Sequence, residues 1–406
     1  MHRPLLDITR TLARASRLVP GAVDRTERAW LMRLADDPAA RFLISAGPRH
    51  VLLDGPGARQ LAGALESGED LPPADLRGAF SPWRTERQRR GDSLARRLAR
   101  AQGENLAALL AAHDADLGGG GWTYLNMAQA QLDASRLREL REGGARRAAA
   151  MVHDLTALER PELTRPSEPG RVLAVLAAVE RADLAIYGGA AVRAAAELHM
   201  DAPPPGVTAP AGLTPLPDAP AAEEAEGAFV MLGAVEPRRG HLAMLQIWDR
   251  LWRELGEAAP RLLILGRRGA EADMVMAVLD RAPMCGRAVF ERRDLSDAEV
   301  AARLRGARAL LAPSIADGAG LQVAEALAAG CPVIASDLPE LRAPGGAAPD
   351  YLDPLDLPAW IEAILAYAHP PEDGPDPRAA QLARLADWHA PGWDAHFAAV
   401  EAALEG

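Results

Sequence analysis

The sequence contains no lysine, so each of its 45 basic residues is an arginine. Cysteine is scarce as well: Cys285 and Cys331 cannot form a disulfide framework, and neither lies in a cluster typical of a metal site. No apolar run approaches the roughly 18 residues that a membrane-spanning helix needs. Residues 1–17 include no continuous apolar stretch. We therefore expect no signal peptide and a cytoplasmic protein.

The chain also lacks an excess of positive charge. Its 56 acidic residues outnumber the arginines, and the formal net charge is −11. This balance argues against a nucleic-acid partner, because attraction to a phosphate backbone needs a basic surface. Any cation that contacts a phosphate group in this chain must be an arginine, whose planar group can donate two parallel hydrogen bonds. For most of the arginines, a biased residue usage is the simpler interpretation.

The length of 406 residues, with 49% hydrophobic content, favours two domains over one. The clearest break is the segment 201–227, which is rich in proline, alanine and glycine and ends in acidic residues. Such a composition does not support a helix or a central strand. We therefore predict an interdomain linker there.

After this segment, short apolar runs alternate with segments of helical periodicity. Strands are predicted over 228–235, 260–266, 287–291, 308–314 and 331–336. Helices are predicted over 241–255, 270–282, 296–307 and 320–330, the third capped by Ser296. This alternation predicts a parallel, doubly wound α/β sheet. The N-terminal half also favours an α/β fold, with strands expected within 49–54, 148–155 and 182–188.

The stretch "DGAGLQVAEALAAGCPVIASD" (317–337) carries two acids eight positions apart, Asp317 and Glu325. Gly318 and Gly320 allow the backbone to approach a ligand closely. The free N–H groups of the helix predicted from Leu321 favour an anion such as a diphosphate. Two acids beside an anion are expected to accept hydrogen bonds from hydroxyl groups that flank it. A sugar joined through a diphosphate to a ribose has this arrangement.

A second segment, "GAVEPRRGH", favours the same kind of ligand. It follows the first predicted strand of the C-terminal half, where Gly233 makes the turn. Arg238 and Arg239 then precede the next predicted helix. Cations beside helix N-termini would neutralise a leaving diphosphate.

These motifs together resemble a known family. A strand, Pro-Ser, an acid, Gly-x-Gly and a glutamate, followed by "A-x-x-x-G-x-P-V-I-x-S", resemble the donor-binding domain of retaining glycosyltransferases of family four. That family has the GT-B fold, in which two Rossmann-like domains face each other across a cleft. The "G-x-x-E-P-R-[KR]" turn is similar to that of its bacterial polysaccharide members, several of which use GDP-mannose. "MVHDLTALERPEL" (151–163) and "PGAVDRTERAW" (20–30) are similar to further segments of the family.

The resemblance implies roles for individual residues. Glu325 would bind the ribose of the donor, and Asp317 the hydroxyl groups of its sugar. Arg238 and Arg239 would bind the diphosphate, and His153 would lie beside the transferred sugar. The other residues predicted to bind the donor are Gly233, Ser314, Gly318, Gly320 and Leu321. On the acceptor side the predicted residues are Gly21, Arg25, Trp122 and Asp154.

The resemblance also implies an organisation and an activity. The acceptor-binding domain would span 1–205, the linker 206–227 and the donor-binding domain 228–375, and a helical segment over 376–406 would return to the N-terminal domain. A hexose would move from a GDP- or UDP-sugar to a polysaccharide or a lipid-linked glycan, with retention of configuration. No metal or other cofactor would be needed.

Several positions depart from the family's pattern. Asp317 replaces the usual glutamate, Ala319 stands where an aromatic residue is common, and Ala234 where many members have arginine. A catalytically weak or silent sugar-nucleotide-binding or scaffold protein is therefore an alternative. A nucleotide-sugar epimerase of the same fold would need extra acid and base residues, which the sequence does not reveal. In the simplest interpretation Asp317 only favours a helix start, and His153 belongs to the core.

One segment of the N-terminal half is strongly basic, with arginines at 84, 87, 89, 90, 96, 97 and 100. A solvated helix face explains it most simply. The alternative is contact with an anionic membrane surface, where each cation contributes roughly 1 kcal/mol. Such contact at the inner face of the membrane would suit a lipid-linked acceptor.

Overall fold

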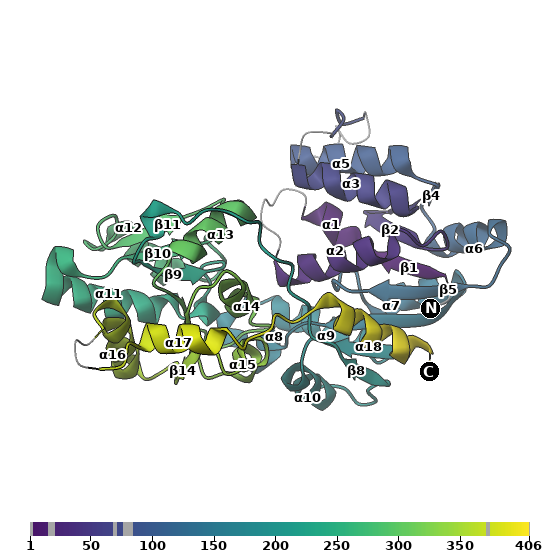
Figure 1. Cartoon of the computed structure of the whole chain (residues 1–406). Coiled ribbons are helices and arrows are strands. Elements are labelled where there is room, and N and C mark those ends of the chain that lie inside the picture. The colour runs from purple at the N-terminus through teal and green to yellow at the C-terminus, as the bar shows by residue number, and fades with distance from the viewer. Residues whose placement is uncertain (1–2, 15–20, 68–70, 76–83, 371–373, 406) are drawn as a thin grey trace. The chain divides into compact units, whose positions relative to one another are not determined.

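The computed structural model describes residues 3–14, 21–67, 71–75, 84–370 and 374–405 and divides into two compact units, each built around its own sheet (Figure 1). The first unit comprises Met1–His153, Gly170–Ala211 and Trp393–Gly406. The second comprises Asp154–Pro169 and Gly212–Gly392.

The first unit contains an eight-stranded sheet in the order β4-β3-β2-β1-β5-β6-β7-β8. Its strands are β1 (Pro4–Asp7), β2 (Arg41–Ala46), β3 (Arg49–Leu53), β4 (Ala101–Gly103), β5 (Trp122–Asn126), β6 (Ala145–Val152), β7 (Leu184–Tyr187) and β8 (Gly206–Thr208). The pairs β2–β3 and β3–β4 are antiparallel, and the other pairs are parallel. The three strands predicted in this half are confirmed as β3, β6 and β7.

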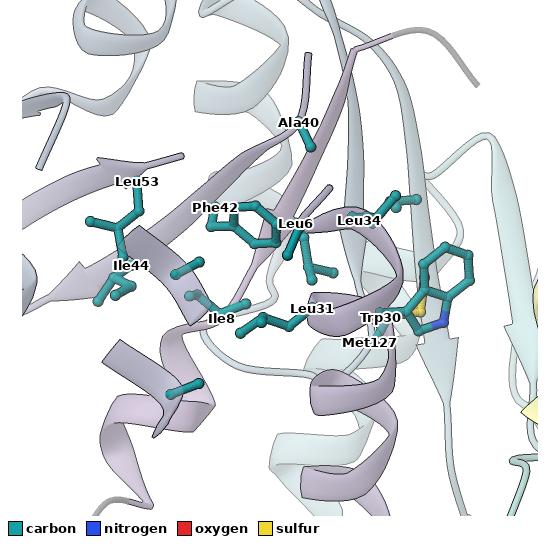
Figure 2. Packing of buried hydrophobic residues seen from close by; sticks show 14 of the residues in the cluster. Leu6, Ile8, Trp30, Leu31, Leu34, Ala40, Phe42, Ile44, Leu53 and Met127 are labelled. Carbon is teal, nitrogen blue, oxygen red and sulfur yellow. The ribbon is translucent and has the colours of Figure 1, made fainter. Parts of the chain in front are cut away.

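Helices pack on this sheet and bury their apolar faces against it. They are α1 (Thr9–Ala13), α2 (Ala22–Leu34), α3 (Gly55–Ser67), α5 (Glu86–Leu98), α6 (Leu106–Asp116), α7 (Ala134–Glu142), α9 (Glu168–Val179), α10 (Ala190–Leu198) and α18 (Trp393–Glu405). Figure 2 shows part of the core, in which Trp30 and Leu31 of α2 share one buried cluster with Phe42 and Ile44 of β2. These four side chains are fully buried.

The last helix, α18, packs on this core although it is distant in sequence. Phe397, Val400 and Leu404 belong to the same buried cluster as the side chains of α2. Trp30 Nε1 donates to His396 Nε2 over 2.9 Å. The Nδ1 of His396 therefore carries the proton and donates to the carbonyl of Ala209 over 3.0 Å.

The second unit contains a six-stranded sheet in the order β11-β10-β9-β12-β13-β14, and its strand pairs are parallel. The strands are β9 (Phe229–Leu232), β10 (Leu262–Leu265), β11 (Val289–Arg292), β12 (Ala309–Ala312), β13 (Val333–Ser336) and β14 (Asp350–Leu352). The first five confirm the predicted strands, and β14 is an addition at the edge. The doubly wound parallel sheet is therefore confirmed for this half.

The helices of the second unit are α8 (Thr156–Glu159), α11 (His241–Leu255), α12 (Asp273–Arg281), α13 (Asp297–Gly306), α14 (Leu321–Ala328), α15 (Pro339–Gly345), α16 (Leu357–Ala368) and α17 (Pro377–Leu385), with short 3-10 turns η1 (Pro161–Leu163), η2 (Glu223–Ala225), η3 (Pro237–Arg239) and η4 (Gly256–Ala258). The four helices predicted over 241–255, 270–282, 296–307 and 320–330 are confirmed as α11, α12, α13 and α14, and the second unit contains further helices as well. Ser296 caps α13 as predicted, because its Oγ accepts from the Glu299 N–H and the Glu299 carboxylate accepts from the Ser296 N–H.

The unit boundaries differ from the expected domain limits of 205, 227 and 375 in three places. The strand β8, expected to lie in the linker, joins the first sheet. The segment Asp154–Pro169 packs with the second unit. Helix α17 does so too, because Gln381 Nε2 donates to the carbonyl of Val333 over 2.7 Å and its Oε1 accepts from the Val333 N–H. Within the expected C-terminal segment, α18 is the part that packs on the first unit.

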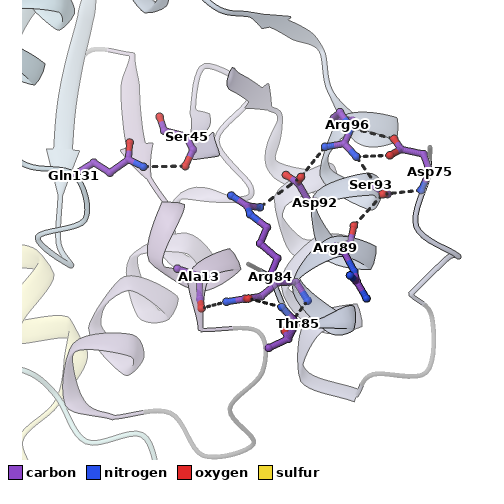
Figure 3. A network of polar contacts seen from close by, with 11 residues as sticks. Ala13, Ser45, Asp75, Arg84, Thr85, Arg89, Asp92, Ser93, Arg96 and Gln131 are labelled. Carbon is purple, nitrogen blue, oxygen red and sulfur yellow. Dashed lines mark hydrogen bonds and ion pairs between the residues drawn. The ribbon is translucent and has the colours of Figure 1, made fainter. Parts of the chain in front are cut away.

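The basic segment forms α5, which lies beside α3 (Figure 1), and most of its arginines bind the protein itself. Arg96 pairs with Asp75 and Asp92, both over 2.7 Å, and Arg84 lies 3.4 Å from the carboxylate of Asp92 (Figure 3). Arg87 and Arg90 donate to backbone carbonyls, and Arg100 pairs with Asp54. These contacts occupy donors that lipid phosphates would otherwise bind. In the described part of the chain, no helix combines the length and hydropathy that crossing a bilayer requires.

Candidate active site

Two adjacent strands of the second unit, β9 and β12, bring the two predicted motifs together. The turn after β9 forms η3, which carries Arg238 and Arg239. The loop after β12 runs to the start of α14. The two segments touch directly, because the N–H of Ile315 donates to the carbonyl of Arg238 over 2.7 Å. The carboxyl ends of parallel strands are where ligands bind in open α/β sheets.

One oxygen of Asp317 is bound by the backbone of its own loop. Oδ1 accepts hydrogen bonds from the N–H groups of Gly318 at 2.9 Å, Ala319 at 3.3 Å and Gly320 at 3.0 Å. These are backbone donors at the N-terminal end of α14, where an anion is favoured. The carboxylate therefore occupies an anion site that the chain itself has built.

The other oxygen, Oδ2, is bound by side chains. Gln322 Nε2 donates to it over 2.9 Å and Ser314 Oγ over 3.3 Å, and Arg239 Nη1 lies 3.1 Å away. Burial alone would raise the pKa of Asp317. Nearby Arg239 and Arg238, with the hydrogen bonds from Gln322 and the loop, instead lower it to about 2. Asp317 is thus a buried, ionised group with both oxygens engaged.

Two glycines of this loop are required by close contacts. Gly320 has a φ of +58°, and a Cβ there would lie 2.5 Å from the carbonyl oxygen of Glu340. A Cβ on Gly318 would lie 2.9 Å from the Cβ of Asp154. The backbone of the loop is therefore approached by α15 on one side and by the 154–169 segment on the other.

Arg238 and Arg239 are surrounded by carboxylates. Arg238 Nε donates to Glu236 Oε2 over 3.1 Å, and its Nη1 lies 3.8 Å from Asp154 Oδ2. Burial would lower the pKa of Arg238, but Asp154, Asp317 and Glu236 raise it. The Nε of Arg239 is buried and has no hydrogen-bond partner among the described residues. An additional acceptor would satisfy this donor.

The remaining predicted donor residues lie on the same unit. Gly233 directly follows β9, and a Cβ there would lie 3.4 Å from the guanidinium carbon of Arg239. Leu321 is the first residue of α14. Glu325 lies on the same helix and is 7% exposed. The structure thus gathers the loop, the arginine turn and the start of α14, while the contacts of Glu325 with a ligand stay a prediction.

The other predicted residues belong to the first unit, with the exception of Asp154. His153 follows β6, and its Nε2 donates to the carbonyl of Met127 over 2.6 Å. Gly21 caps α2, and Arg25 is buried within that helix. Trp122 is 1% exposed at the amino end of β5. The expectation that Trp122 faces an acceptor therefore does not fit, because its indole lies in the core, away from the carboxyl ends of the strands.

Sequence reasoning missed two polar neighbours of the site, Glu236 and Gln322, and assigned a third to another part of it. Asp154 was expected on the acceptor side, yet the structure places it against Gly318 and Arg238. Glu236 was visible within "EPRR", and its spacing from Arg238 was the available signal. Nothing in the sequence distinguishes Gln322 as a site residue, because glutamine is common in helices. Within the part of the chain that the structure describes, no group of three His, Cys, Asp or Glu side chains is arranged to hold a metal ion.

Part of the chain is similar to known proteins. Residues 226–369 match the family model described as glycosyl transferases group 1. The serotype-specific mannosyltransferase WbdA of Escherichia coli is 32% identical over 157 residues, which are 37% of this chain and 19% of WbdA. The O-antigen chain mannosyltransferase B of Escherichia coli is 29% identical over 140 residues, 34% of this chain and 36% of that protein. The chain therefore matches about a fifth of WbdA's length.

Solved structures extend the likeness to both units. The structural alignment with an alpha,alpha-trehalose 6-phosphate synthase from Burkholderia multivorans covers 100% of this chain and 98% of the synthase, with a TM-score of 0.58 at 12% identity. The fold is GT-B. The alignment with a sucrose-phosphate synthase from Thermosynechococcus elongatus covers 74% of this chain and 75% of that synthase, with a TM-score of 0.54 at 18% identity. At such identities the likeness concerns the fold alone.

Proposed function

We propose that this chain is a retaining glycosyltransferase of family four that transfers a hexose from a nucleotide-diphosphate sugar to a polysaccharide or lipid-linked glycan. The donor binds at the loop after β12 and the turn after β9. Mannose is the first sugar to test, because the two curated relatives compared above are named mannosyltransferases. The first unit binds the acceptor, and His153 lies near the transferred sugar.

The observation that carries the proposal is the placement of two arginines beside the N-terminal end of α14. The side chain of Arg239 is 19% exposed and that of Arg238 22%. The buried Nε of Arg239 lacks an acceptor among the described residues. A diphosphate is an anion that could satisfy such donors. The site lies within the span that matches the glycosyl transferases group 1 family.

In this mechanism the chain acts mainly by electrostatics. The bond between the sugar's anomeric carbon and the diphosphate breaks, and the two arginines and the helix N-terminus stabilise the departing charge. The acceptor hydroxyl forms its bond to the same face of that carbon. Its proton passes to an oxygen of the departing phosphate, so the reaction needs no dedicated protein base. It needs no metal or other cofactor either.

A silent sugar-nucleotide-binding protein of the same fold is the second candidate. The specific observation in its favour is that both oxygens of Asp317 are already engaged by the protein. The carboxylate therefore has less capacity to accept hydrogen bonds from sugar hydroxyls than the sequence suggested. Binding of donor without turnover would favour this candidate. Membrane contact through residues 84–100 stays a secondary proposal, weakened by the internal contacts of those arginines.

Thermal unfolding in the presence of UDP, GDP, ADP and their hexose conjugates tests the proposed donor class. One class of nucleotide should raise the melting temperature. A ligand at 100 times its dissociation constant adds about 2.7 kcal/mol to stability. Nucleosides without phosphates should give a much smaller shift, since the proposed site binds the diphosphate. If none of the nucleotides shifts the transition, the proposed donor site is wrong.

A further inference from the structure

The arginine turn of the second unit, η3 (Pro237–Arg239), has more carboxylates around it than arginines. Asp154, Glu236 and Asp317 lie around Arg238 and Arg239, so three acidic groups face two cations. A diphosphate that binds here brings further negative charge. It can bind tightly only if at least one carboxylate gives up its arginine, because like charges at short range repel strongly where water is scarce.

The three carboxylates are held with very different strength. Asp317 is bound by three backbone N–H groups and by the side chains of its neighbours, and its side chain is 5% exposed. Glu236 is 28% exposed, lies 3.1 Å from Arg238 on the same turn, and has its Cγ beside Gly269. Asp154 is the most exposed, at 35%, and lies farthest from its arginine, at 3.8 Å.

Asp154 also differs in the chain segment that carries it. It begins the segment Asp154–Pro169, which reaches the second unit from a distant part of the sequence. Its Oδ1 accepts a long hydrogen bond of 3.3 Å from the N–H of Thr156, two residues later. Its Cβ packs against Gly318, in the loop whose backbone N–H groups donate to Asp317. A small movement of this segment would free Arg238 without disturbing Asp317.

We propose that Asp154 is an internal competitor of the donor's diphosphate for Arg238. In the free protein its carboxylate neutralises the arginine. The diphosphate displaces it on binding, while Asp317 remains in place and keeps the loop and Arg239 positioned. After transfer, the return of Asp154 to Arg238 promotes release of the nucleoside diphosphate. This inference rests on the proposed function and adds an affinity-determining residue to the same site.

The test is calorimetric titration of the full chain and of Asp154→Asn with UDP, GDP and inorganic pyrophosphate. Removal of the competing charge should tighten binding of these ligands roughly two- to fivefold, which corresponds to the worth of a partly exposed ion pair. Affinity for uridine and guanosine should not change, because they lack the phosphates. A structural effect of the substitution would not separate the two ligand groups in this way. Asp154→Ala should show the same gain.

Two control variants sharpen the result. Glu162→Gln removes one negative charge from an exposed position of the same segment and should leave every affinity unchanged. Glu236→Gln removes the other acid beside Arg238. If Glu236→Gln alone tightens diphosphate binding, or if Asp154→Asn and Asp154→Ala bind diphosphates no better than the natural chain, the inference is overturned.

The outcomes separate this inference from the proposed function. If the natural chain binds a nucleoside diphosphate and the Asp154 variants bind it equally well, the inference alone fails. If only the Asp154 variants bind, the competition is stronger than expected and the inference is supported. If neither the natural chain nor the variants bind any diphosphate, the proposed donor site fails and the inference fails with it.

Discussion

Replacement of Glu325 by alanine is expected to weaken the binding of a nucleoside diphosphate and of its sugar donor by the same factor. The proposed partner of this carboxylate is the ribose, which both ligands contain. Hydrogen bonds to a charged acceptor are worth roughly 1.5–3 kcal/mol, which corresponds to a loss of about 10- to 150-fold in affinity. Calorimetric titration with both ligands measures the effect.

The position of Glu325 makes a control necessary. The residue is 7% exposed, so its removal could also disturb α14. Glu362 lies at an exposed position of α16 and provides a matched glutamate-to-alanine change outside the site. Thermal unfolding of both variants without ligand shows whether the fold is kept. A folded Glu325→Ala variant that binds the nucleotide as tightly as the natural chain would refute the ribose assignment.

Replacement of Asp317 by alanine is expected to destabilise the second unit by roughly 3 kcal/mol. The substitution leaves three loop amides without their acceptor and Arg239 without its closest carboxylate, and breaking a buried ion pair from one side is costly. For a unit of this size the melting temperature should fall by roughly 6–12 °C. Asp337→Ala, which breaks an exposed pair with Arg342, should lower the melting temperature far less.

The same carboxylate should make stability depend on pH. Because Arg239, Arg238 and the hydrogen bonds lower the pKa of Asp317 to about 2 in the folded protein, its stabilising effect is complete above about pH 4. It is lost as the pH falls from about 4 to about 2, by roughly 2 kcal/mol. Asp317→Asn should remove this part of the acid dependence. Melting of Asp317→Ala at the temperature of the natural chain, or an unchanged acid profile in Asp317→Asn, would contradict the account.

The strands and helices of the second unit could be predicted from sequence because each is short, apolar and bounded by glycine, proline or a capping residue. The helix over 241–255 and the Ser296 cap are found where the pattern placed them. The edge strand β14 was missed because its three residues include Asp350 and are only half-buried. In the first unit, the antiparallel pairing of β3 was not predictable, since a short apolar run carries no information about direction.

The limits of the prediction are clearest at the site. The sequence brought Asp317, Arg238 and the loop glycines to one place correctly, because adjacent strands of a parallel sheet end at the same edge. It could not show that the short side chain of Asp317 would turn back onto its own loop. Nor could it place Asp154 beside Arg238, because that contact depends on the path of a segment 84 positions away in sequence. The direction that a side chain takes and the path of the chain are tertiary properties.

The central claim, that the chain transfers a sugar from a nucleotide donor bound at the arginine turn, is tested most directly by release of nucleoside diphosphate from GDP-mannose and from UDP-hexoses. The full chain should release the nucleotide from one of these donors. Because removal of one group that stabilises transition-state charge typically costs about 100-fold or more in rate, Arg238→Gln/Arg239→Gln should release almost none. Binding of the donor without measurable release by the natural chain, or equal release by the double variant, would contradict the account.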